Sequence, residues 1–423
     1  MECVRIFPLK GLTPFQHRQI WQAQQEAARV WNQCKDAHLE ARSQRLKWPQ
    51  RSELQPLTKS LYALHSQSIQ MICHAFLSNV EATRELRKAG IKIRYPYKTK
   101  LFYPLLWPAQ AVKIHANRVI LPMGLGREKL ILKLKLPKGA GACKLVYAQG
   151  YELHVTYHVD VVPKAEGEAK AAVDLGEIHQ AAVSTGTGKA LVVSGRGIRT
   201  LKRDRAKALG ELARKRSRCK PGSRRRKKLN WAARKVSQRA KRRVRDLRHK
   251  GTRLVIDFCQ AEGVSTLYVG NPHGVRKRNS GRKHNQRMST WEYGKDIQYL
   301  KDKSKKAGIH CFTGTERGTS SQCPECLHRQ RPKGRQWVCR VCGFMGHRDV
   351  VGSVNMHPIA FDAKIGFPQV ITYLRPGRIS RRRSSSLDTG RCCLSKAGSQ
   401  PPGRGITILD RVSSETGHIP AFA

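Results

Sequence analysis

The cysteines of the C-terminal half have a spacing typical of a metal site. Cys323-Pro-Glu-Cys326 is followed, after twelve residues, by Cys339-Arg-Val-Cys342. Two CxxC pairs at this separation present four thiolates as a tetrahedron, which is the ligand set of closed structural Zn²⁺ sites. A redox function would need only one such pair. We therefore expect these four cysteines to bind a structural zinc ion, with no ligand position left open for catalysis.

Two aspartates form a second candidate group. Asp174 ends the apolar run Ala-Ala-Val-Asp, and Asp349 follows the cysteine pairs at the start of a predicted helix. An acid among apolar residues is costly unless it is paired, hydrogen-bonded or bound to a cation. Asp174 taken alone would be interpreted as a turn or capping residue. The presence of both aspartates makes a cation site the hypothesis to test.

The elements that position these residues begin with an N-terminal region, residues 1–165. Residues 1–9 alternate as a strand, helical periodicity covers about 12–90, and short strands separated by turn residues fill 92–162. The second helical segment is predicted to run from Glu53 to Lys88. We expect a mostly antiparallel β-barrel with an inserted helical bundle, which gives the chain an α+β multidomain fold.

Residues 166–358 alternate between strands and helices, which predicts an α/β domain with a zinc ribbon at 319–346 inserted in it. Two of its strands, Ser265–Val269 and Ile309–Thr315, are separated by a predicted helix. Such a connection favours parallel neighbours, so both strands are expected to end at the same edge of the sheet.

Positive charge dominates the composition. The chain has 423 residues with 82 Lys and Arg against 29 Asp and Glu, a net charge of +53. Residues 199–250 alone hold 24 basic and three acidic residues and predict two basic helices joined at Lys220-Pro-Gly222. So much charge requires a polyanion, of which nucleic acid is the commonest, and it argues against an enzyme of small molecules.

The ends of the chain carry further expectations. The N-terminus lacks the apolar core of a signal peptide, and no run of about 18 apolar residues occurs, so we expect a cytoplasmic protein with no membrane partner. Residues 359–423 are rich in Arg, Ser, Gly and Pro beyond Pro368 and are expected to form a basic, disordered tail.

Several of these features together resemble TnpB, a family of transposon-encoded RNA-guided endonucleases related to the miniature type V CRISPR effectors. The resemblance rests on Asp174-Leu-Gly, the basic helices, Thr319-Ser320 before the first cysteine pair, and Cys342-Gly-x-x-x-His-Arg-Asp349 with Asn355. It covers about residues 170–358. It implies a RuvC-like nuclease domain of the RNase H type, in which three carboxylates bind two Mg²⁺ ions, with Asp174 as the first and Asp349 as the last.

The middle carboxylate departs from the family pattern. Where most members carry a Glu after the strand Ser-Thr-Leu-Tyr-Val, this chain has Gly270-Asn271-Pro272. Glu316, at the end of the next parallel strand, matches a variant of the family with a relocated Glu. Glu292 is the alternative, although as a helix-face charge near Lys295 it has an ordinary structural interpretation. Asn271 offers a neutral oxygen.

Other polar residues near these motifs have both a functional and a structural interpretation. Glu177 is expected to be an exposed turn residue, and His347 and Arg348 either approach a phosphate or stabilise the loop that leaves the ribbon. Trp21 and Trp31 could stack on bases, although tryptophans on helices more often belong to the core.

The resemblance implies an RNA-guided endonuclease, a hydrolase that cuts double-stranded DNA beside a short transposon-associated motif. Its expected partners are a guide RNA and target DNA, with one protein copy per RNA in the bacterial nucleoid, and the basic helices would bind the RNA backbone. Two alternatives remain open: a nuclease-inactive RNA-guided repressor, motivated by the missing Glu, and a transposase proper that acts in DNA recombination.

Overall fold

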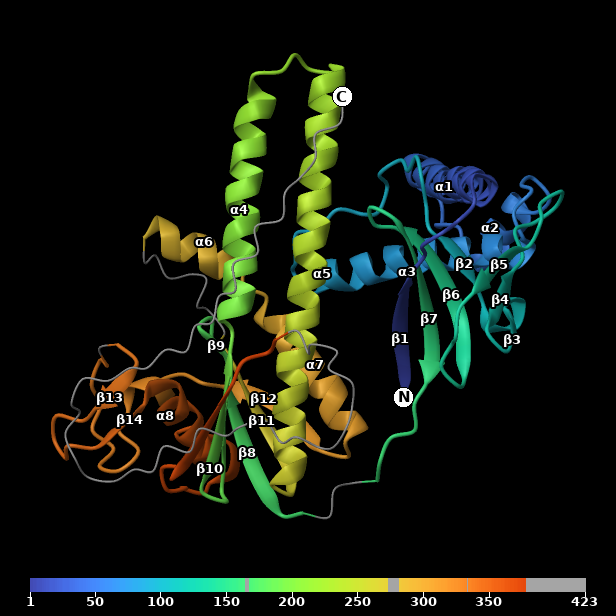
Figure 1. Cartoon of the computed structure of the whole chain (residues 1–423). Helices are drawn as coiled ribbons and strands as arrows, with labels where there is room; N and C mark the ends of the chain where they lie inside the picture. The colour runs from blue at the N-terminus through green and yellow to red at the C-terminus, as the bar shows by residue number, and fades with distance from the viewer. Residues whose placement is uncertain (164–166, 273–280, 333, 378–423) are drawn as a thin grey trace.

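The computed structural model describes residues 1–163, 167–272, 281–332 and 334–377. Its N-terminal strands and helices lie on one side of a long helical hairpin, and a second sheet lies at the base of that hairpin (Figure 1). The expected boundary near residue 165 falls within 164–166, and most of the expected tail falls within 378–423, so both lie outside the described residues. No helix in the described ranges is long and apolar enough to cross a membrane.

The N-terminal region contains two antiparallel sheets. The first has the order β1-β7-β6-β2, and in it β1 (Glu2–Pro8) pairs along its whole length with β7 (Tyr151–His158). The first strand therefore joins strands from the far end of the region, as the sequence predicted. The expected barrel is not confirmed, because the strand pairings of the described residues give two separate sheets. The remaining strands of the two sheets are β2 (Leu105–Trp107), β6 (Ala140–Tyr147), β3 (Lys113–His115), β4 (Arg118–Leu121) and β5 (Leu130–Lys133).

Three helices connect the first strand to these sheets: α1 (Pro14–Ser43), α2 (Arg51–Thr58) and α3 (Ser66–Lys88). Helix α1 begins with a capping box, in which the Thr13 hydroxyl accepts from the Gln16 amide and the Gln16 side chain accepts from the Thr13 amide, each at 3.1 Å. The prediction of one helix from Glu53 to Lys88 was wrong. The chain leaves α2 with Lys59 in an extended conformation and Ser60 at φ 60°, a conformation that no α-helix contains.

The second sheet has the order β12-β11-β8-β9-β10-β15. The central strand β8 (Ala169–Asp174) pairs antiparallel with β9 (His179–Thr185), which pairs antiparallel with β10 (Lys189–Ser194). On its other side β8 is parallel to β11 (Val264–Asn271), and β11 is parallel to β12 (His310–Thr315). The predicted parallel neighbours are therefore confirmed.

The expected tail contains ordered elements at its start. Helix α9 (His357–Phe361) follows directly on α8 (Arg348–Val354), and β15 (Val370–Leu374) adds to the sheet parallel to β10. The prediction of a disordered tail from residue 359 was therefore wrong for residues 359–377. The composition is misleading here because β15 has only five residues. So short a segment hardly changes the average composition of a region that is otherwise rich in Arg.

The hairpin consists of α4 (Arg196–Ser217) and α5 (Arg224–Ala261). Helix α5 continues without a break over 38 residues, so the second predicted basic helix extends beyond residue 250 into an apolar segment. Its C-terminal half buries Val255, Ile256 and Cys259 against the sheet, while its N-terminal half extends beyond it. Two further helices, α6 (Arg282–Thr290) and α7 (Tyr293–Lys306), flank its base.

Candidate functional site

The neighbouring parallel strands β8, β11 and β12 end at the same edge of the second sheet, and two acidic residues lie at that edge. Val173 of β8 is level with Val269 of β11, and Gly270 is level with Gly314 of β12. Asp174 therefore ends β8 beside Gly270, while Glu316 follows the last residue of β12. The strand order and direction thus bring together two acids that are 142 positions apart in the sequence.

Glu316 occupies the space that a side chain on β11 would need. A Cβ atom placed on Gly270 would lie 2.8 Å from Glu316 Oε2 and 2.7 Å from Met356 Cε. These distances are shorter than van der Waals contact, so a side chain at position 270 would require the flexible ends of Glu316 and Met356 to move aside. Glycine at position 270 thus leaves room for the Glu316 carboxylate where it lies.

Helix α8 lies over the same edge and contributes Asp349 in its first turn. The helix approaches β8 so closely that a Cβ atom on Gly352 would lie 2.5 Å from Asp174 Oδ2. Glycine at 352 is what allows this approach, since any side chain there would displace the Asp174 carboxylate. Asp349 precedes Gly352 by one turn and is held over the strand ends. We refer to Asp174, Glu316 and Asp349 as the carboxylate site.

Within the carboxylate site, Asp174 and Glu316 make no ion pair with any described residue, in contrast to Asp349. Burial raises the pKa of Asp174 well above its usual value, and the negative charges of Glu316 and Asp349 raise it further. Burial raises the pKa of Glu316 to about 7, and its Oε2 atom is buried without a hydrogen-bond partner. The pKa of Tyr293 is also raised, chiefly by burial and secondly by the negative charge of Glu316. Oxygen ligands in this electrostatic environment fit a hard divalent cation.

Asp349 has partners that sequence reasoning missed. His179 Nδ1 lies 2.7 Å from Asp349 Oδ2, and Arg335 Nη1 donates to both carboxylate oxygens at 3.0 and 2.9 Å. Burial acts to raise the pKa of Asp349, but the hydrogen bond with His179 and the charge of Arg335 outweigh it and lower this pKa. No local signal could have identified His179, because its partner lies 170 residues away.

The two histidines near Asp349 extend this group. Among the described residues, two separate groups have potential metal-ligating atoms that all lie within 4.8 Å of one another. One consists of His179, His347 and Asp349, and the other of the four cysteines. Asp174 and Glu316 do not belong to that histidine group, so Asp349 is turned toward the imidazoles and Arg335. The His347 ring lies 5.0 Å from that of His179, and its Nδ1 atom is buried without a hydrogen-bond partner.

Glu292 and Glu177 are occupied elsewhere. Glu292 lies 3.5 Å from Lys202 and 3.9 Å from Arg248, and it accepts a hydrogen bond from Lys295. Burial acts to raise its pKa, but the Lys295 hydrogen bond and these cations lower it overall. Glu177 was expected to be an exposed turn residue, which was wrong, because its largely buried side chain pairs with Arg199 at 3.2 Å.

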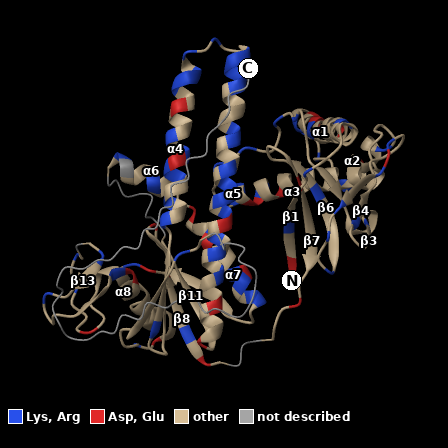
Figure 2. Ribbon diagram, in the orientation of Figure 1, with Lys and Arg blue, Asp and Glu red and all other residues tan. Residues whose placement is uncertain are grey.

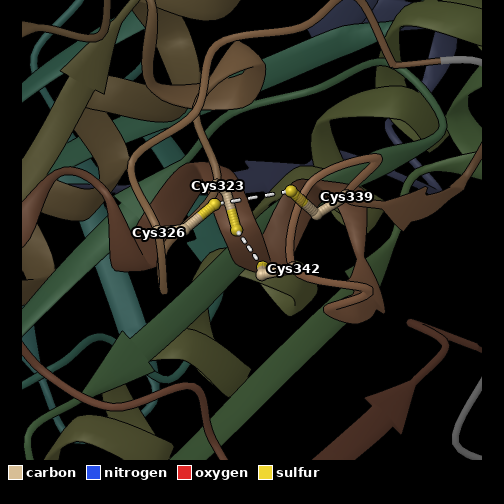
Figure 3. Close-up of side chains that lie close together, drawn as sticks. All are labelled: Cys323, Cys326, Cys339 and Cys342. Atoms are coloured by element: carbon tan, nitrogen blue, oxygen red, sulfur yellow. Dashed lines mark hydrogen bonds between the residues drawn. The ribbon is translucent and has the colours of Figure 1, made fainter.

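The four cysteines lie together in two facing turns (Figure 3). Their Sγ atoms are all within 4.8 Å of one another, with 3.6 Å between Cys323 and Cys342 and 3.5 Å between Cys326 and Cys339. A tetrahedron with Zn–S bonds of about 2.3 Å has S···S edges of about 3.8 Å, so the arrangement fits zinc. We refer to these four residues as the cysteine cluster.

The ribbon that carries the cysteine cluster is tied to the carboxylate site. The Asn355 side chain, just after α8, donates to the carbonyl oxygens of Thr319 and Gln322 at 2.7 and 2.8 Å. The Thr319 hydroxyl donates to the Glu316 carbonyl at 2.9 Å. Thr319 thus braces the start of the ribbon, as expected. The short strands β13 (Gln336–Val338) and β14 (Met345–His347) complete it, and Arg335 reaches Asp349 from the start of β13.

Lys and Arg residues are distributed along both helices of the hairpin (Figure 2). Its base is fixed to the N-terminal region by Arg242, whose Nε atom lies 2.9 Å from Glu152 Oε1. Of the two tryptophans considered for base stacking, Trp31 is buried in the core and Trp21 is 48% exposed beside Phe102. Arg199, at the start of α4, pairs with Glu177, three residues after Asp174, so the basic hairpin begins close to that end of β8.

Comparison with known proteins places these features in a class. Residues 154–276 match the family OrfB_IS605, described as a probable transposase, and residues 293–356 match the Cas12f1-like TNB domain. The first match contains Asp174 and the hairpin, and the second contains Glu316, the cysteine cluster and Asp349. The resemblance to TnpB-type proteins is thereby confirmed.

Individual relatives agree with this class. A TnpB-like protein of Methanocaldococcus jannaschii is 27% identical over 132 residues, which are 30% of this chain and 47% of the relative. The chain thus matches about half the length of that curated relative. Cas12f1, solved in a complex with single guide RNA and target DNA, is similar in structure with a TM-score of 0.56 and 14% identity, over 79% of this chain and 81% of that one. This likeness concerns the fold. The mini RNA-guided endonuclease Cas_phi3 matches with a TM-score of 0.48 and 10% identity, over 87% and 94% of the two chains.

Proposed function

We propose that this chain is an RNA-guided DNA endonuclease of the TnpB type, which cuts double-stranded DNA beside a short transposon-associated motif. The observation that carries the proposal is the carboxylate site: three acids from separate elements converge, and two of them, Asp174 and Glu316, make no ion pair with any described residue. The similarity to TnpB and Cas12f1 supports the same general kind of protein. In this proposal residues 166–358 form a RuvC-like domain, and residues 1–165 recognise the duplex motif and the RNA.

Asp174, Glu316 and Asp349 would hold two Mg²⁺ ions, whose chemistry in such sites is to activate water and to stabilise the departing 3′ oxygen. Asp174 and Glu316 must release protons for this, because their raised pKa values favour the neutral form in the free protein. His179 orients Asp349 by its hydrogen bond to Oδ2. Arg335 donates to both Asp349 oxygens and would orient this carboxylate, whose oxygens each keep a second lone pair for a metal ion.

The cysteine cluster would bind zinc and thereby fix the ribbon that carries Arg335. The hairpin would bind the guide RNA and its heteroduplex with the target through backbone phosphates, which gives affinity and register rather than sequence readout. One protein copy would act with each RNA.

Cleavage with the copurifying RNA tests the proposal. The RNA bound to the purified chain is sequenced, and a plasmid with a matching target is incubated with the complex and Mg²⁺. We expect double-strand cleavage, which Asp174→Ala reduces by at least about 1,000-fold while RNA and target binding persist. Undiminished cleavage by this variant would refute the site. Target binding without cleavage by the unaltered chain would indicate the nuclease-inactive repressor instead.

A second candidate, a transposase proper, is favoured by one observation, the description of the family that matches residues 154–276. It predicts strand-transfer products from DNA ends in the absence of RNA. The ribbon tied to the carboxylate site by Arg335 and Asn355 favours the guided nuclease, because the second match, to the Cas12f1-like TNB domain, covers this ribbon.

A further inference from the structure

A pocket at the base of the hairpin is separate from the carboxylate site. It lies between α4, α5 and the segment that joins α6 to α7, and its volume is about 430 Å³. Pockets of this size accommodate small organic ligands. We refer to it as the α5–α7 pocket.

The pocket has a strong excess of positive charge. Its lining contains six basic side chains and one acidic side chain. The acid is Glu292, which is already paired with Lys202 and Lys295. Arg205, Lys241 and Arg245 make no ion pair with any other residue in the described ranges. The lining basic residues are Lys202, Arg205, Lys241, Arg245, Arg248 and Lys295. An anion is therefore the ligand that this lining would stabilise, and a metal cation is excluded.

Arg248 is a buried cation at the pocket wall. Its side chain is only 1% exposed, and its Nη1 atom donates to Asp296 and to the Glu292 carbonyl. Its Nε and Nη2 atoms are enclosed by protein, and its guanidinium lies over the Trp291 ring, 5.3 Å from the ring centroid. Arg248 therefore contributes its positive charge to the pocket lining from a fixed position.

Lys202 adds to this local excess. Burial lowers the pKa of its ammonium group, and the charge of Arg248 lowers it further. Two cations thus repel one another at the pocket wall, and a bound anion would relieve that repulsion.

An aromatic wall distinguishes the pocket from a simple phosphate site. Tyr299 lines it, and its ring is stacked on His249 with centroids 4.0 Å apart and an angle of 21°. Ser237 and Ser289 also line the pocket, and the Ser289 hydroxyl donates to the Gln286 carbonyl at 3.0 Å. A rigid aromatic surface beside guanidinium groups suits a flat base joined to a phosphate.

We propose that the α5–α7 pocket binds one nucleotide of a single-stranded RNA segment, with its phosphate against Lys241, Arg245 and Arg248 and its base against Tyr299. The choice of RNA as the source rests on the proposed function, whereas nucleotide binding itself does not. A base held in this pocket would add base readout to a hairpin that otherwise contacts only the backbone.

Binding of small probes tests the proposal. The full chain, freed of nucleic acid at high salt, is titrated by calorimetry with AMP, adenosine and inorganic phosphate. We expect AMP to bind at one site, at least about tenfold more tightly than either fragment, because only AMP engages both walls. Equal affinities for AMP and phosphate, or no saturable binding, would overturn the nucleotide assignment.

Matched variants locate the site. Lys241→Ala with Arg245→Ala should weaken AMP binding about tenfold or more. Arg203→Ala with Arg243→Ala removes the same charge from exposed positions outside the pocket, one on α4 and one on α5, and should change AMP binding less than about twofold. Tyr299→Leu should weaken AMP but not phosphate, and Tyr299→Phe should weaken neither. Equal losses in the two double variants would mean a diffuse electrostatic effect and contradict the proposal. Thermal unfolding of each variant identifies any loss caused by misfolding.

Two further measurements test whether the bound nucleotide comes from RNA, and whether a negative result counts against the pocket or against the proposed nuclease. A short single-stranded RNA should displace AMP from the unaltered chain but not from the Lys241→Ala, Arg245→Ala variant, and failure to displace it would overturn RNA as the source. The Asp174→Ala protein should bind AMP normally. Loss of cleavage with AMP binding intact therefore counts against the nuclease alone, and intact cleavage without AMP binding counts against the pocket alone.

Discussion

The cysteine cluster and the carboxylate site are both suited to cations, but they are assembled in opposite ways. All four cysteines come from 20 consecutive positions, and two CxxC turns place their sulfur atoms within 4.8 Å of one another. The carboxylates come from the ends of β8 and β12 and from α8, and Asp349 is turned toward His179 and Arg335. Local spacing thus determines the first site, whereas strand order determines the second.

The electrostatic consequences differ as well. Four thiolates within one ribbon form a closed ligand set that suits a permanent structural ion. The charged forms of Asp174 and Glu316 are destabilised as long as no cation is bound, as their raised pKa values indicate. A site of this kind is suited to ions that bind and react.

The largest effect is expected from a substitution in the cysteine cluster, the site that local spacing assembles. Cys323→Ser should unfold the ribbon, since the free energy of zinc binding is the folding free energy of such a module, about 10 kcal/mol or more. Cleavage should fall to background because Arg335 and Asn355 lose their positions. Zinc content and circular dichroism provide the measurement. Cys219→Ser, at the tip of the hairpin, is the matched control and should retain both zinc and cleavage. A folded, zinc-loaded Cys323→Ser protein would contradict this interpretation.

The next effect tests which acid completes the distant site. Glu316→Ala should lower the cleavage rate at least about 100-fold, as expected for loss of a ligand to the catalytic ions. Glu292→Ala should change it less than about threefold, because Glu292 lies among Lys202, Arg248 and Lys295 instead. Single-turnover cleavage under identical conditions compares the two. The reverse order of effects would make Glu292 the middle ligand.

A swap of positions sharpens the packing argument. Gly270→Glu combined with Glu316→Ala should cleave about tenfold faster than Glu316→Ala alone, because without the Glu316 carboxylate only the flexible end of Met356 has to move aside for the new side chain. Gly270→Glu alone should impair cleavage, since its Cβ atom would lie 2.8 Å from Glu316 Oε2. Gly270→Gln combined with Glu316→Ala controls for volume without charge and should give no recovery. Absence of recovery in the Glu-containing double variant would mean that position 270 cannot direct a carboxylate into the site.

The smallest effect concerns stability and pH. Burial raises the pKa of Glu316 from 4.5 to about 7, so the folded chain holds this proton more tightly than the unfolded chain. This contribution to stability is fully present below pH 4.5 and is lost as the pH rises through 7. Glu316→Gln, which cannot ionise, should therefore be more stable than the unaltered chain at pH 8 by about 1–2 kcal/mol, with no advantage near pH 4.

Urea unfolding in buffer freed of divalent ions by resin measures this difference and leaves the zinc in place. Added Mg²⁺ should stabilise the unaltered chain more than the variant, because only the former keeps the full set of carboxylates. If the unaltered chain and Glu316→Gln differed in stability by the same amount at pH 4 and pH 8, burial would not raise the pKa of Glu316, and this prediction would be wrong.

Sequence reasoning was most successful where a short segment suffices. The CxxC spacing identified the cysteine cluster, and the alternation of strands and helices placed β11 and β12 side by side, so that Glu316 could be suggested as a neighbour of Asp174. It failed where short elements depend on distant partners. Five residues of β15 form a strand only because β10 offers its edge, and the break after α2 follows from the conformations of Lys59 and Ser60.

The sequence by itself determined the ligands of the ribbon, the excess charge of the hairpin and the identity of Asp174 and Asp349 as candidate ligands. Residue type and local spacing carry that information, because thiol geometry and charge density need no distant partner. Only the tertiary structure decided that Glu316 fills the space above Gly270, that His179 and Arg335 hold Asp349, and that six basic residues line one pocket at the base of the hairpin. These contacts join residues up to 170 positions apart, and the packing of α8 and α5 against the sheet is what brings them together.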